Sequence, residues 1–341
     1  MKKFLSVVLV LAMVLVVMTG CSGGSKPEGN ENSAPADDGK VYTLKMSTQL
    51  NETHPMVDGF KELAKRVEEK TNGKLKIEVY PSAQLGSDED VIEQAIQGVN
   101  VAVLTDGGRM ANYVKEMGII GMPYFADGYD DILKVTQSDI FKEWEDQLVK
   151  EDGIRVLSFN WYDGARHFLT NKPVTKPADL NGLRIRTPGA PVWSESIKAM
   201  GATPVSMPWT EVYQAMQQKA IDGAEGQYTA TYTSRLYEVL KYIDKTSHFQ
   251  LVNGIIVGEK WFDTLPEEYQ KILLEETKAV AAENAQLVMK LSDEYEKKMV
   301  EKGMKVVNVD INAFKAAADK AYDVLGYREL REKIYAEIGK K

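Results

Sequence analysis

Residues 41–105 alternate between the hydrophobic period of a β-strand and that of an α-helix, and this alternation restricts the chain to an α/β fold. The alternation gives a strand at 42–46, a helix at 60–67, a strand at 75–79, a helix at 87–99 and a strand at 101–105. The second helix begins with the capping-box-like "SDED". The last strand, "VAVLT", is uniformly apolar, as strands buried on both faces are. This order predicts an α/β sheet with a parallel core.

The same periodicity predicts elements toward the C-terminus. It gives strands at 154–159, 183–186, 202–207 and 246–257, helices at 192–200, 210–219 and 266–303, and two further helical segments in 311–340. We expect Thr210 to cap the helix that follows it. The long amphipathic helix after Pro266 is expected to pack along its own chain, and the alternative is that it binds a partner helix.

The N-terminus predicts an exported protein. Lys2 and Lys3 precede an apolar run that is too short to span a bilayer comfortably, and "MTGC" then ends at Cys21. We therefore expect a signal peptide at 1–20. Because "MTGC" is similar to a bacterial lipobox, we also expect lipid attachment at Cys21 and an extracytoplasmic location at the cell membrane. The alternative is a secreted protein with a free N-terminal thiol. The following tether, 21–40, has no large apolar side chain, which predicts flexibility.

Charge and cysteine content exclude several classes of protein. The chain has 42 basic and 50 acidic residues, and without Lys2 and Lys3 the 40 remaining basic residues leave a formal charge of −10. An acidic protein is not expected to bind nucleic acid. Cys21 is the only cysteine, so disulfides do not hold the fold together. No cluster has the spacing of metal ligands, so we expect no metal and no cofactor.

Two arginines after predicted strands are candidate anion ligands. In "LRIR", Arg186 is the last strand residue, and ligands of open α/β sheets lie outside the carboxyl ends of the strands. A guanidinium there can donate two parallel hydrogen bonds to a carboxylate, and the alternative is a surface arginine paired with an acid. Arg166 stands in "NWYDGARHF", whose aromatic residues indicate either a ligand cleft or core packing. His167 is expected to be structural.

The segment "DGAEGQYTATY" at 222–232 carries two carboxylates that could form an acid–base pair in a hydrolase. They are Asp222 and Glu225. No nucleophile or metal ligand accompanies them, so a hydrogen-bonded turn is the preferred interpretation and we do not expect an enzyme. The glycine pair at 107–108 lacks the lysine of a phosphate-binding loop and the spaced glycines of a dinucleotide-binding turn.

Seven segments then identify a family by their order and spacing. They are "THP" (53–55), "KTNGKLKIEVYPSAQLGSDEDVIEQAIQG" (70–98), "MPYFADGYD" (122–130), "KPADLNGLRIRTP" (176–188), "MGATPVSMPWTEVYQAMQQKAIDGAEG" (200–226), "YEVLKYIDKTSH" (237–248) and "LPEEYQKIL" (265–273). Together they resemble the solute-binding subunit of tripartite ATP-independent periplasmic (TRAP) transporters, the dicarboxylate-binding DctP class.

The resemblance implies a fold and a function. The fold is a two-lobed periplasmic-binding-protein-like α/β fold with mixed sheets, hinged lobes and a long C-terminal helix. One lobe is expected at 41–163 plus 252–291 and the other at 164–251 plus 292–341. The implied function is capture of a carboxylate-containing organic acid, either a C4-dicarboxylate or a sugar acid, and its delivery to the small and large membrane subunits of the permease. The alternatives are a receptor for another transporter or for a sensor kinase and, less favoured, a lipoprotein hydrolase.

The resemblance also assigns site residues. It implies that the substrate carboxylate pairs with Arg186 and that Arg166 is a second substrate contact. The aromatic residue of the cleft falls at Trp209.

A departure from the family pattern adds further candidates. Relatives often carry "DGxENP" where this chain has "DGAEGQ", so Gly226 and Gln227 replace an asparagine and a proline. We expect Gly226 to widen the cleft, and ligand hydroxyl groups to meet Gln227 and Tyr228. Glu225 and His54 complete the set of substrate-binding candidates.

Overall fold

A single mixed β-sheet forms the framework of residues 39–340, the part of the chain that this computed structural model describes. Its strands are β1 (Tyr42–Ser47), β2 (Leu75–Tyr80), β3 (Val101–Asp106), β4 (Ile154–Thr170), β5 (Arg184–Thr187), β6 (Thr203–Ser206), β7 (Gly223–Gly226), β8 (Tyr242–Gly258) and β9 (Lys305–Val307). Their order is β2-β1-β3-β8-β4-β7-β5-β6, and β9 pairs with β8 outside this path.

The two ends of the sheet are parallel and its middle is antiparallel. β1 pairs in parallel with β2 and β3, and β5 pairs in parallel with β6 and β7. Between these ends, β8 is antiparallel to β3 and to β4, and β4 is antiparallel to β7. The predicted parallel core is thus confirmed at each end of the sheet, and the α/β class is confirmed as a whole.

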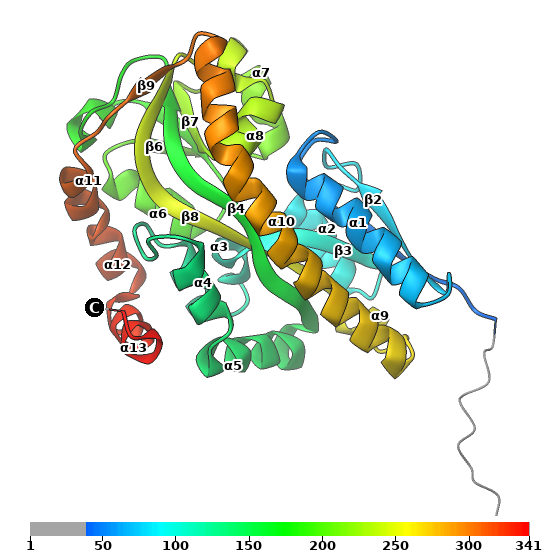
Figure 1. The fold of residues 1–341 in the computed structure, drawn as a ribbon. Coiled ribbons are helices and arrows are strands. Elements are labelled where there is room, and N and C mark those ends of the chain that lie inside the picture. Colours follow the sequence, from blue (N-terminus) through cyan, green and yellow to red (C-terminus); the bar gives the residue numbers. More distant parts are fainter. Residues whose placement is uncertain (1–38, 341) are drawn as a thin grey trace, which may run out of the picture. The chain divides into compact units, whose positions relative to one another are not determined.

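Two long strands, β4 and β8, connect the parallel ends. Each has 17 residues, and their pairing shifts register at several places, the first between Val156 and Ser158. Register shifts of this kind bend a strand, and Figure 1 shows both strands curving across the molecule. The sequence pattern predicted only residues 154–159 of β4, because polar residues and Gly164 interrupt the apolar run beyond that point.

Helices cover the sheet on both faces. They are α1 (Pro55–Lys70), α2 (Asp88–Ile96), α3 (Gly107–Met110), α4 (Tyr129–Thr136), α5 (Asp139–Gln147), α6 (Pro191–Ala199), α7 (Val212–Gln217), α8 (Tyr228–Thr233), α9 (Glu259–Phe262), α10 (Glu267–Glu301), α11 (Ile311–Ala318), α12 (Lys320–Leu325) and α13 (Arg328–Ile338). Shorter 3₁₀ or π turns occupy Lys115–Gly121, Leu148–Asp152, Pro177–Leu180, Trp209–Glu211 and Leu236–Glu238.

The predicted helix starts are confirmed for α2 and wrong for α7. Ser87 and Asp90 form the capping box that "SDED" predicts, although α2 ends at Ile96 and not at residue 99. Thr210 does not cap α7, because it lies inside a 3₁₀ turn, and α7 has no side-chain cap. The backbone N–H of Trp209 in that turn is held by the side chain of a residue far away in sequence, a tertiary contact that local propensity does not contain.

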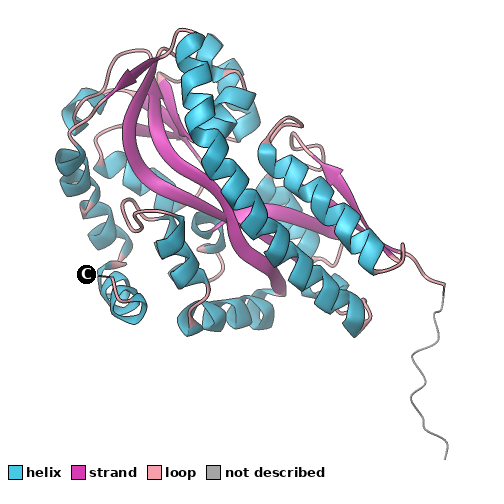
Figure 2. Cartoon of the chain, viewed as in Figure 1, coloured by secondary structure: helices cyan, strands magenta, loops and turns pink. Residues whose placement is uncertain are grey.

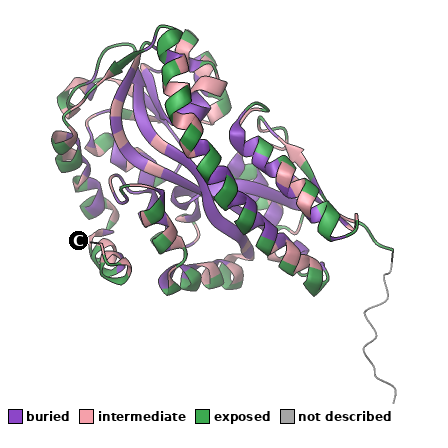
Figure 3. Cartoon of the chain, in the orientation of Figure 1, coloured by how far each residue is buried: buried purple, intermediate pink, exposed green. Residues whose placement is uncertain are grey.

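Helix α10 is the long helix that the sequence predicts. It has 35 residues, and Figure 2 shows it lying along the two long strands, with its main contacts to β4, α1 and α8. Its apolar residues, among them Val280, Ala281 and Val288, are buried, while its outer face is exposed in Figure 3. The expected packing of its amphipathic face against its own chain is therefore confirmed.

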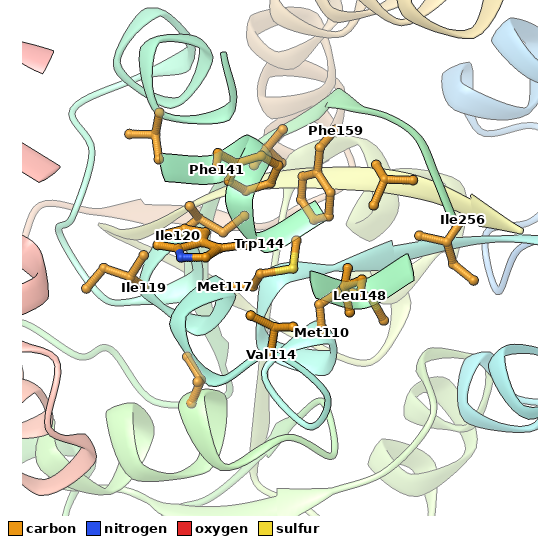
Figure 4. Packing of buried hydrophobic residues seen from close by; sticks show 14 of the residues in the cluster. Met110, Val114, Met117, Ile119, Ile120, Phe141, Trp144, Leu148, Phe159 and Ile256 are labelled. Atoms are coloured by element: carbon orange, nitrogen blue, oxygen red, sulfur yellow. The ribbon is translucent and has the colours of Figure 1, made fainter. Parts of the chain in front are cut away.

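Apolar clusters on the two faces of the sheet supply the core. In the cluster drawn in Figure 4, Phe141 of α5 meets Phe159 of β4 with ring centroids 5.3 Å apart, and Ile256 of β8 joins them. The same cluster includes Tyr322 of α12 and Ile334 of α13. The last helices therefore pack back onto elements from the first half of the chain.

Most of the predictions made for the N-terminus concern residues that precede the described part of the chain. The signal peptide at 1–20, the lipid attachment at Cys21 and the tether up to residue 38 lie outside the described residues. Among the helices of residues 39–340, none is both long enough and apolar enough to cross a membrane.

The contact between α2 and β8 gives a test of the packing. A Cβ at Gly258 would lie 1.8 Å from the backbone carbonyl oxygen of Ala95, so Gly258→Ala must push α2 off the sheet. We expect the free energy of unfolding to fall by roughly 3 kcal/mol, the upper part of the range for overpacking. Urea unfolding followed by far-UV circular dichroism measures this loss.

Gly128→Ala is the matched control for that substitution. No atom lies within 4 Å of a Cβ at Gly128, and its φ of 177° suits any residue. The control is expected to change the free energy of unfolding by less than about 0.5 kcal/mol. Equal losses in the two variants would contradict the packing described for Gly258.

Candidate ligand-binding site

A cavity of about 70 Å³ lies against the carboxyl ends of short strands from both ends of the sheet. Five residues of its wall follow such strand ends: Gln49 follows β1, Arg109 follows β3, Pro188 follows β5, Trp209 follows β6 and Gln227 follows β7. The long strands β4 and β8 add side chains from their middles. Ligands of open α/β sheets bind at such strand ends, and here the two ends of one sheet converge on the same cavity.

The structure brings four of the seven predicted substrate-binding residues to the wall of this cavity: Arg186, Arg166, Trp209 and Gln227. The other three do not line it: Glu225, Tyr228 and His54. A larger cavity of about 580 Å³ elsewhere holds none of the seven. The arginine in that larger cavity, Arg155, is already paired with Glu259. The larger volume of that cavity therefore does not make it the candidate site. The smaller cavity is the candidate because it brings together predicted residues and an arginine that is unpaired among residues 39–340.

Arg186 is a buried arginine without an acidic partner. It is 2% exposed, its Nε donates to the backbone carbonyl of Met207 at 3.0 Å, and its guanidinium lies 5.1 Å from the ring centroid of Trp209. Within residues 39–340, no carboxylate oxygen lies within 4 Å of it, whereas every other arginine there forms an ion pair. Burial, with a contribution from Arg166, lowers the pKa of Arg186 to about 9. The folded chain thus holds a cation that an anionic ligand would stabilise.

Arg166 is neutralised from behind by Glu225. The fully buried Glu225 carboxylate contacts Nε of Arg166 and accepts a hydrogen bond from Nη2 at 2.6 Å, while the Thr187 hydroxyl donates to it at 3.2 Å. Burial raises the pKa of Glu225, and Arg166 and Arg186 oppose that shift. His248 lies 4.0 Å from the same carboxylate and is neutral, because burial lowers its pKa well below the usual value. Glu225 therefore orients Arg166 from outside the cavity wall.

Tyr228 and His54 support the wall from behind. Tyr228 stacks on His167 with ring centroids 4.6 Å apart, and burial lowers the pKa of His167 to about 3, which makes it the structural histidine that the sequence predicts. His54 caps α1, because its Nδ1 accepts the backbone N–H of Met56 at 3.2 Å. Its Nε2 lies 3.4 Å from Oδ1 of Asp163, which does line the cavity.

Gly226 makes room for an indole ring. A Cβ at this position would lie 2.9 Å from the Trp209 ring. The Trp209 ring is held there by the hydrogen bond that its N–H donates to Ser234 at 2.9 Å and by its contact with Arg186. Trp209 thus occupies the space that the missing side chain leaves, and the effect of Gly226 on the width of the cleft stays a prediction.

Several polar residues of the wall were not predicted from the sequence. They are Gln49, Asp88, Asp106, Arg109, Asp163 and Asn253. Arg109 follows the glycine pair that the motif comparison set aside; it donates to Asp106 and to Glu89 at 2.8 Å and lies 3.3 Å from Asp88. Its position after a buried strand is the same signal that selected Arg186, and it could have been found in that way. The other positions depend on how distant strands converge.

Hydrogen bonds connect the two sides of the cavity. Gln49 donates to Asp88 at 2.6 Å and accepts the backbone N–H of Trp209 at 2.8 Å. The indole N–H of Trp193 on α6 donates to Asp106 at 3.1 Å. These bonds join residues that follow β1 and β3 to residues near β5 and β6, so the two sides of the cavity are in direct contact.

The two carboxylates considered for hydrolysis engage different arginines. Asp222 pairs with Arg184 at the surface, with Nε and Oδ2 2.9 Å apart. Glu225 pairs with Arg166 in the interior. The two carboxylates therefore do not form an acid–base pair. The alternative considered for Arg186, a surface arginine paired with an acid, describes Arg184 instead.

A cavity lined by an arginine without an acidic partner in the described chain, between two parallel sheet ends that share two long strands, is typical of a two-lobed solute-binding protein. The chain matches the DctP family, described as bacterial extracellular solute-binding protein, family 7, over residues 46–329. The chain belongs to this family, whose members bind solutes for transport. The resemblance drawn from the seven sequence segments is thereby confirmed.

Individual relatives agree in length and differ in ligand. The sialic acid-binding periplasmic protein SiaP of Vibrio cholerae is 29% identical over 290 residues, covering 85% of this chain and 90% of SiaP. The C4-dicarboxylate-binding periplasmic protein DctP of the same species is 29% identical over 250 residues, covering 72% and 74%.

Solved TRAP periplasmic solute-binding proteins share the fold. One from Ochrobacterium anthropi with bound L-fuconate has a TM-score of 0.85 and 33% identity, covering 87% of this chain and 99% of that one. One from Actinobacillus succinogenes with bound L-galactonate has a TM-score of 0.83 and 28% identity, with the same coverage. One from Fusobacterium, with bound sn-glycerol 3-phosphate, has a TM-score of 0.81 and 27% identity, covering 88% and 100%.

The buried pair behind the wall predicts a large loss of stability. Glu225→Gln leaves the buried Arg166 without its counter-charge, which costs about 3–5 kcal/mol of unfolding free energy in comparable pairs. Chemical denaturation of the purified variant measures it. Asp222→Asn, which breaks the solvated surface pair with Arg184, is the control and is expected to lose far less. A similar loss in both variants would contradict the buried network.

Asp88 predicts a pH dependence of stability. Burial raises the pKa of Asp88 from 3.8 to about 6, so the folded state favours the protonated carboxyl. The protonated Asp88 carboxyl contributes to the free energy of unfolding below about pH 4, and this contribution is lost as the pH rises through about 6. We expect the unfolding midpoint of the wild type to fall relative to that of Asp88→Asn between pH 4 and pH 7. Unfolding of both proteins at a series of pH values measures this difference.

Asp222→Asn provides the control for that titration. Its hydrogen bond with Arg184 lowers the pKa of Asp222, so this carboxyl is already ionised throughout pH 5–7. The difference between wild type and Asp222→Asn is expected to be flat over that range. A flat difference for Asp88→Asn would disprove the burial effect at Asp88.

Proposed function

We propose that this chain is the extracytoplasmic solute-binding lipoprotein of a TRAP transporter. In this proposal it captures a carboxylate-containing organic acid in the cavity between its lobes and delivers it to the small and large membrane subunits of the permease. The observation that carries the proposal is Arg186, a buried cation without an acidic partner, whose terminal nitrogens are available to a ligand at the cavity wall.

The charges at this end of the cavity favour a carboxylate. Arg166 already has Glu225 as its counter-ion, so Arg186 contributes a single unbalanced positive charge. A monoanionic carboxylate matches this charge and can accept two parallel hydrogen bonds from the guanidinium. A phosphate monoester carries more negative charge than one arginine balances. An aldonate, the kind of ligand bound to two of the relatives, therefore matches the charge of this site better than sn-glycerol 3-phosphate, which is bound to another relative.

The lobes are proposed at 41–163 plus 252–291 and at 164–251 plus 292–341. In this division β4 and β8 cross from one lobe to the other, and their register shifts provide the bending points of the hinge. α12 and α13 belong to the second lobe in this division, but they pack on the apolar cluster of the first lobe and therefore also cross between the lobes. A ligand bound to Arg186 would favour closure by adding its own contacts to the hydrogen bonds that already cross the cavity.

The proposed location depends on the N-terminus. The signal peptide at 1–20 would be removed, lipid on Cys21 would anchor the chain to the cell membrane, and the tether at 21–40 would let the binding lobes reach the permease. Replacement of Cys21 by serine is the direct test of the anchor, with release of the protein from washed membranes as the readout.

The binding function is tested at Arg186. The full-length chain is titrated with C4-dicarboxylates, aldonates, uronates and sn-glycerol 3-phosphate, and the unfolding midpoint and heat of binding are recorded. A true ligand raises the midpoint because it binds the folded state. We expect Arg186→Ala to weaken binding by more than about 30-fold, and Arg186→Lys to weaken it measurably because lysine lacks the planar guanidinium.

Arg184→Ala is the matched control for this test. Arg184 lies two residues away on the same strand but pairs with Asp222 at the surface. Its loss is expected to leave the ligand affinity unchanged. Binding that survives in Arg186→Ala, or the absence of binding by every acid, would refute the proposed function.

A further inference from the structure

A second uncompensated charge faces the cavity, and it is negative. Asp163 on β4 is 3% exposed and lines the cavity wall. Among the described residues, no arginine or lysine nitrogen lies within 4 Å of its carboxylate. Its Oδ1 accepts the Thr229 hydroxyl at 3.0 Å and lies 3.4 Å from Nε2 of His54, while Oδ2 has no hydrogen bond with a residue of 39–340. One carboxylate oxygen is thus held by the protein and the other is left to the cavity.

His54 lies beside Asp163. Its Nδ1 accepts the backbone N–H of Met56, which leaves the ring proton on Nε2. Nε2 is buried 3.4 Å from Oδ1 of Asp163 and has no hydrogen-bond partner in the described chain. His54 therefore caps α1 and packs its ring against Asp163, which makes it a positioning residue.

The other acids at the wall are already engaged. Asp106 accepts hydrogen bonds from Arg109 and from the Trp193 indole, and Asp88 lies beside Arg109 and accepts a bond from Gln49. Asp163 has no such cation, and burying an uncompensated carboxylate is costly unless donors satisfy it.

Asp163 is also not the counter-ion of Arg186. No ion pair joins the two side chains, and the only ionisable partner of Asp163 within 4 Å among the described residues is the His54 ring. The wall therefore presents an unbalanced cation at one place and an unbalanced anion at another, each with free hydrogen-bonding capacity.

We propose that Asp163 selects the substrate class: the site takes a monocarboxylate that carries hydroxyl groups away from its carboxylate, as aldonic acids do, and rejects dicarboxylates. This inference rests on the proposed function, in which Arg186 binds the carboxylate. Ligand hydroxyl groups donate to Oδ2 of Asp163, which supplies the missing donors. A second carboxylate would meet an uncompensated like charge in a buried site, which is strongly unfavourable. The sialic acid-binding and C4-dicarboxylate-binding relatives, at equal identity, do not decide between these classes.

Matched pairs of acids provide the test. Galactonate and galactarate have the same carbon chain, and so do gluconate and glucarate; in each pair the second acid replaces the terminal CH₂OH by a carboxylate. Isothermal titration of the full-length chain with both pairs and with succinate gives the affinities. We expect at least one aldonate to bind at least about tenfold more tightly than the matching dicarboxylate. The dicarboxylate lacks the terminal hydroxyl that would donate a charge-assisted hydrogen bond to Asp163, and its second carboxylate is repelled by Asp163.

Two variants separate selection from folding. Asp163→Asn keeps the shape but removes the charge, and it is expected to weaken aldonate binding by about 10- to 100-fold and to reduce the discrimination against the dicarboxylate. His54→Asn retains a good helix cap but cannot reach Asp163. It is expected to weaken aldonate binding several-fold with little change in the unfolding midpoint, a result that a purely structural role would not give.

The outcomes distinguish this inference from the proposed function. If galactarate, glucarate or succinate binds the wild type as tightly as the aldonates and binding is lost in Arg186→Ala, Asp163 does not select the substrate, while the proposed function stands. Unchanged discrimination in Asp163→Asn overturns the inference in the same way. If no carboxylate binds, both proposals fail together.

Discussion

The arrangement of this protein depends on one constraint, the burial of Arg186 without an acidic partner. A buried guanidinium needs hydrogen-bond acceptors, and residues 39–340 supply only the Met207 carbonyl and the face of Trp209. Glu225, which could have neutralised it, is held by Arg166 and Thr187 instead. The surrounding residues therefore keep Arg186 in position while leaving its charge for a ligand.

The sheet explains why such a site can form between two lobes. Each parallel end directs the carboxyl ends of its strands, and thus its connecting loops, toward the same space. The antiparallel strands β4 and β8 set these ends opposite one another and are long enough to belong to both. Gln49 and Trp209 then meet across the cavity, which ties the backbone of one side to a side chain of the other.

The charges of the wall give more specific information than family membership. The family includes relatives named for sialic acid and for C4-dicarboxylates, so membership alone leaves the ligand open. In this chain Arg109 pairs with three carboxylates and Arg166 pairs with Glu225. Among the described residues, Arg186 has no carboxylate within 4 Å and Asp163 has no arginine or lysine nitrogen within 4 Å. A ligand that matches this pattern needs one carboxylate and several neutral donors.

The sequence by itself determined the α/β class, the long helix α10 and the position of Arg186 near the end of a strand, because periodicity and strand-end position are local properties of the chain. It did not determine that Glu225 lies behind Arg166, that Gly226 accommodates Trp209, or that His54 lies behind Asp163. These facts join residues tens to more than a hundred positions apart, and only the folded sheet brings them together. Local patterns show which side chains can carry charge, but burial and pairing decide which charges remain for a ligand, and both are properties of the tertiary structure.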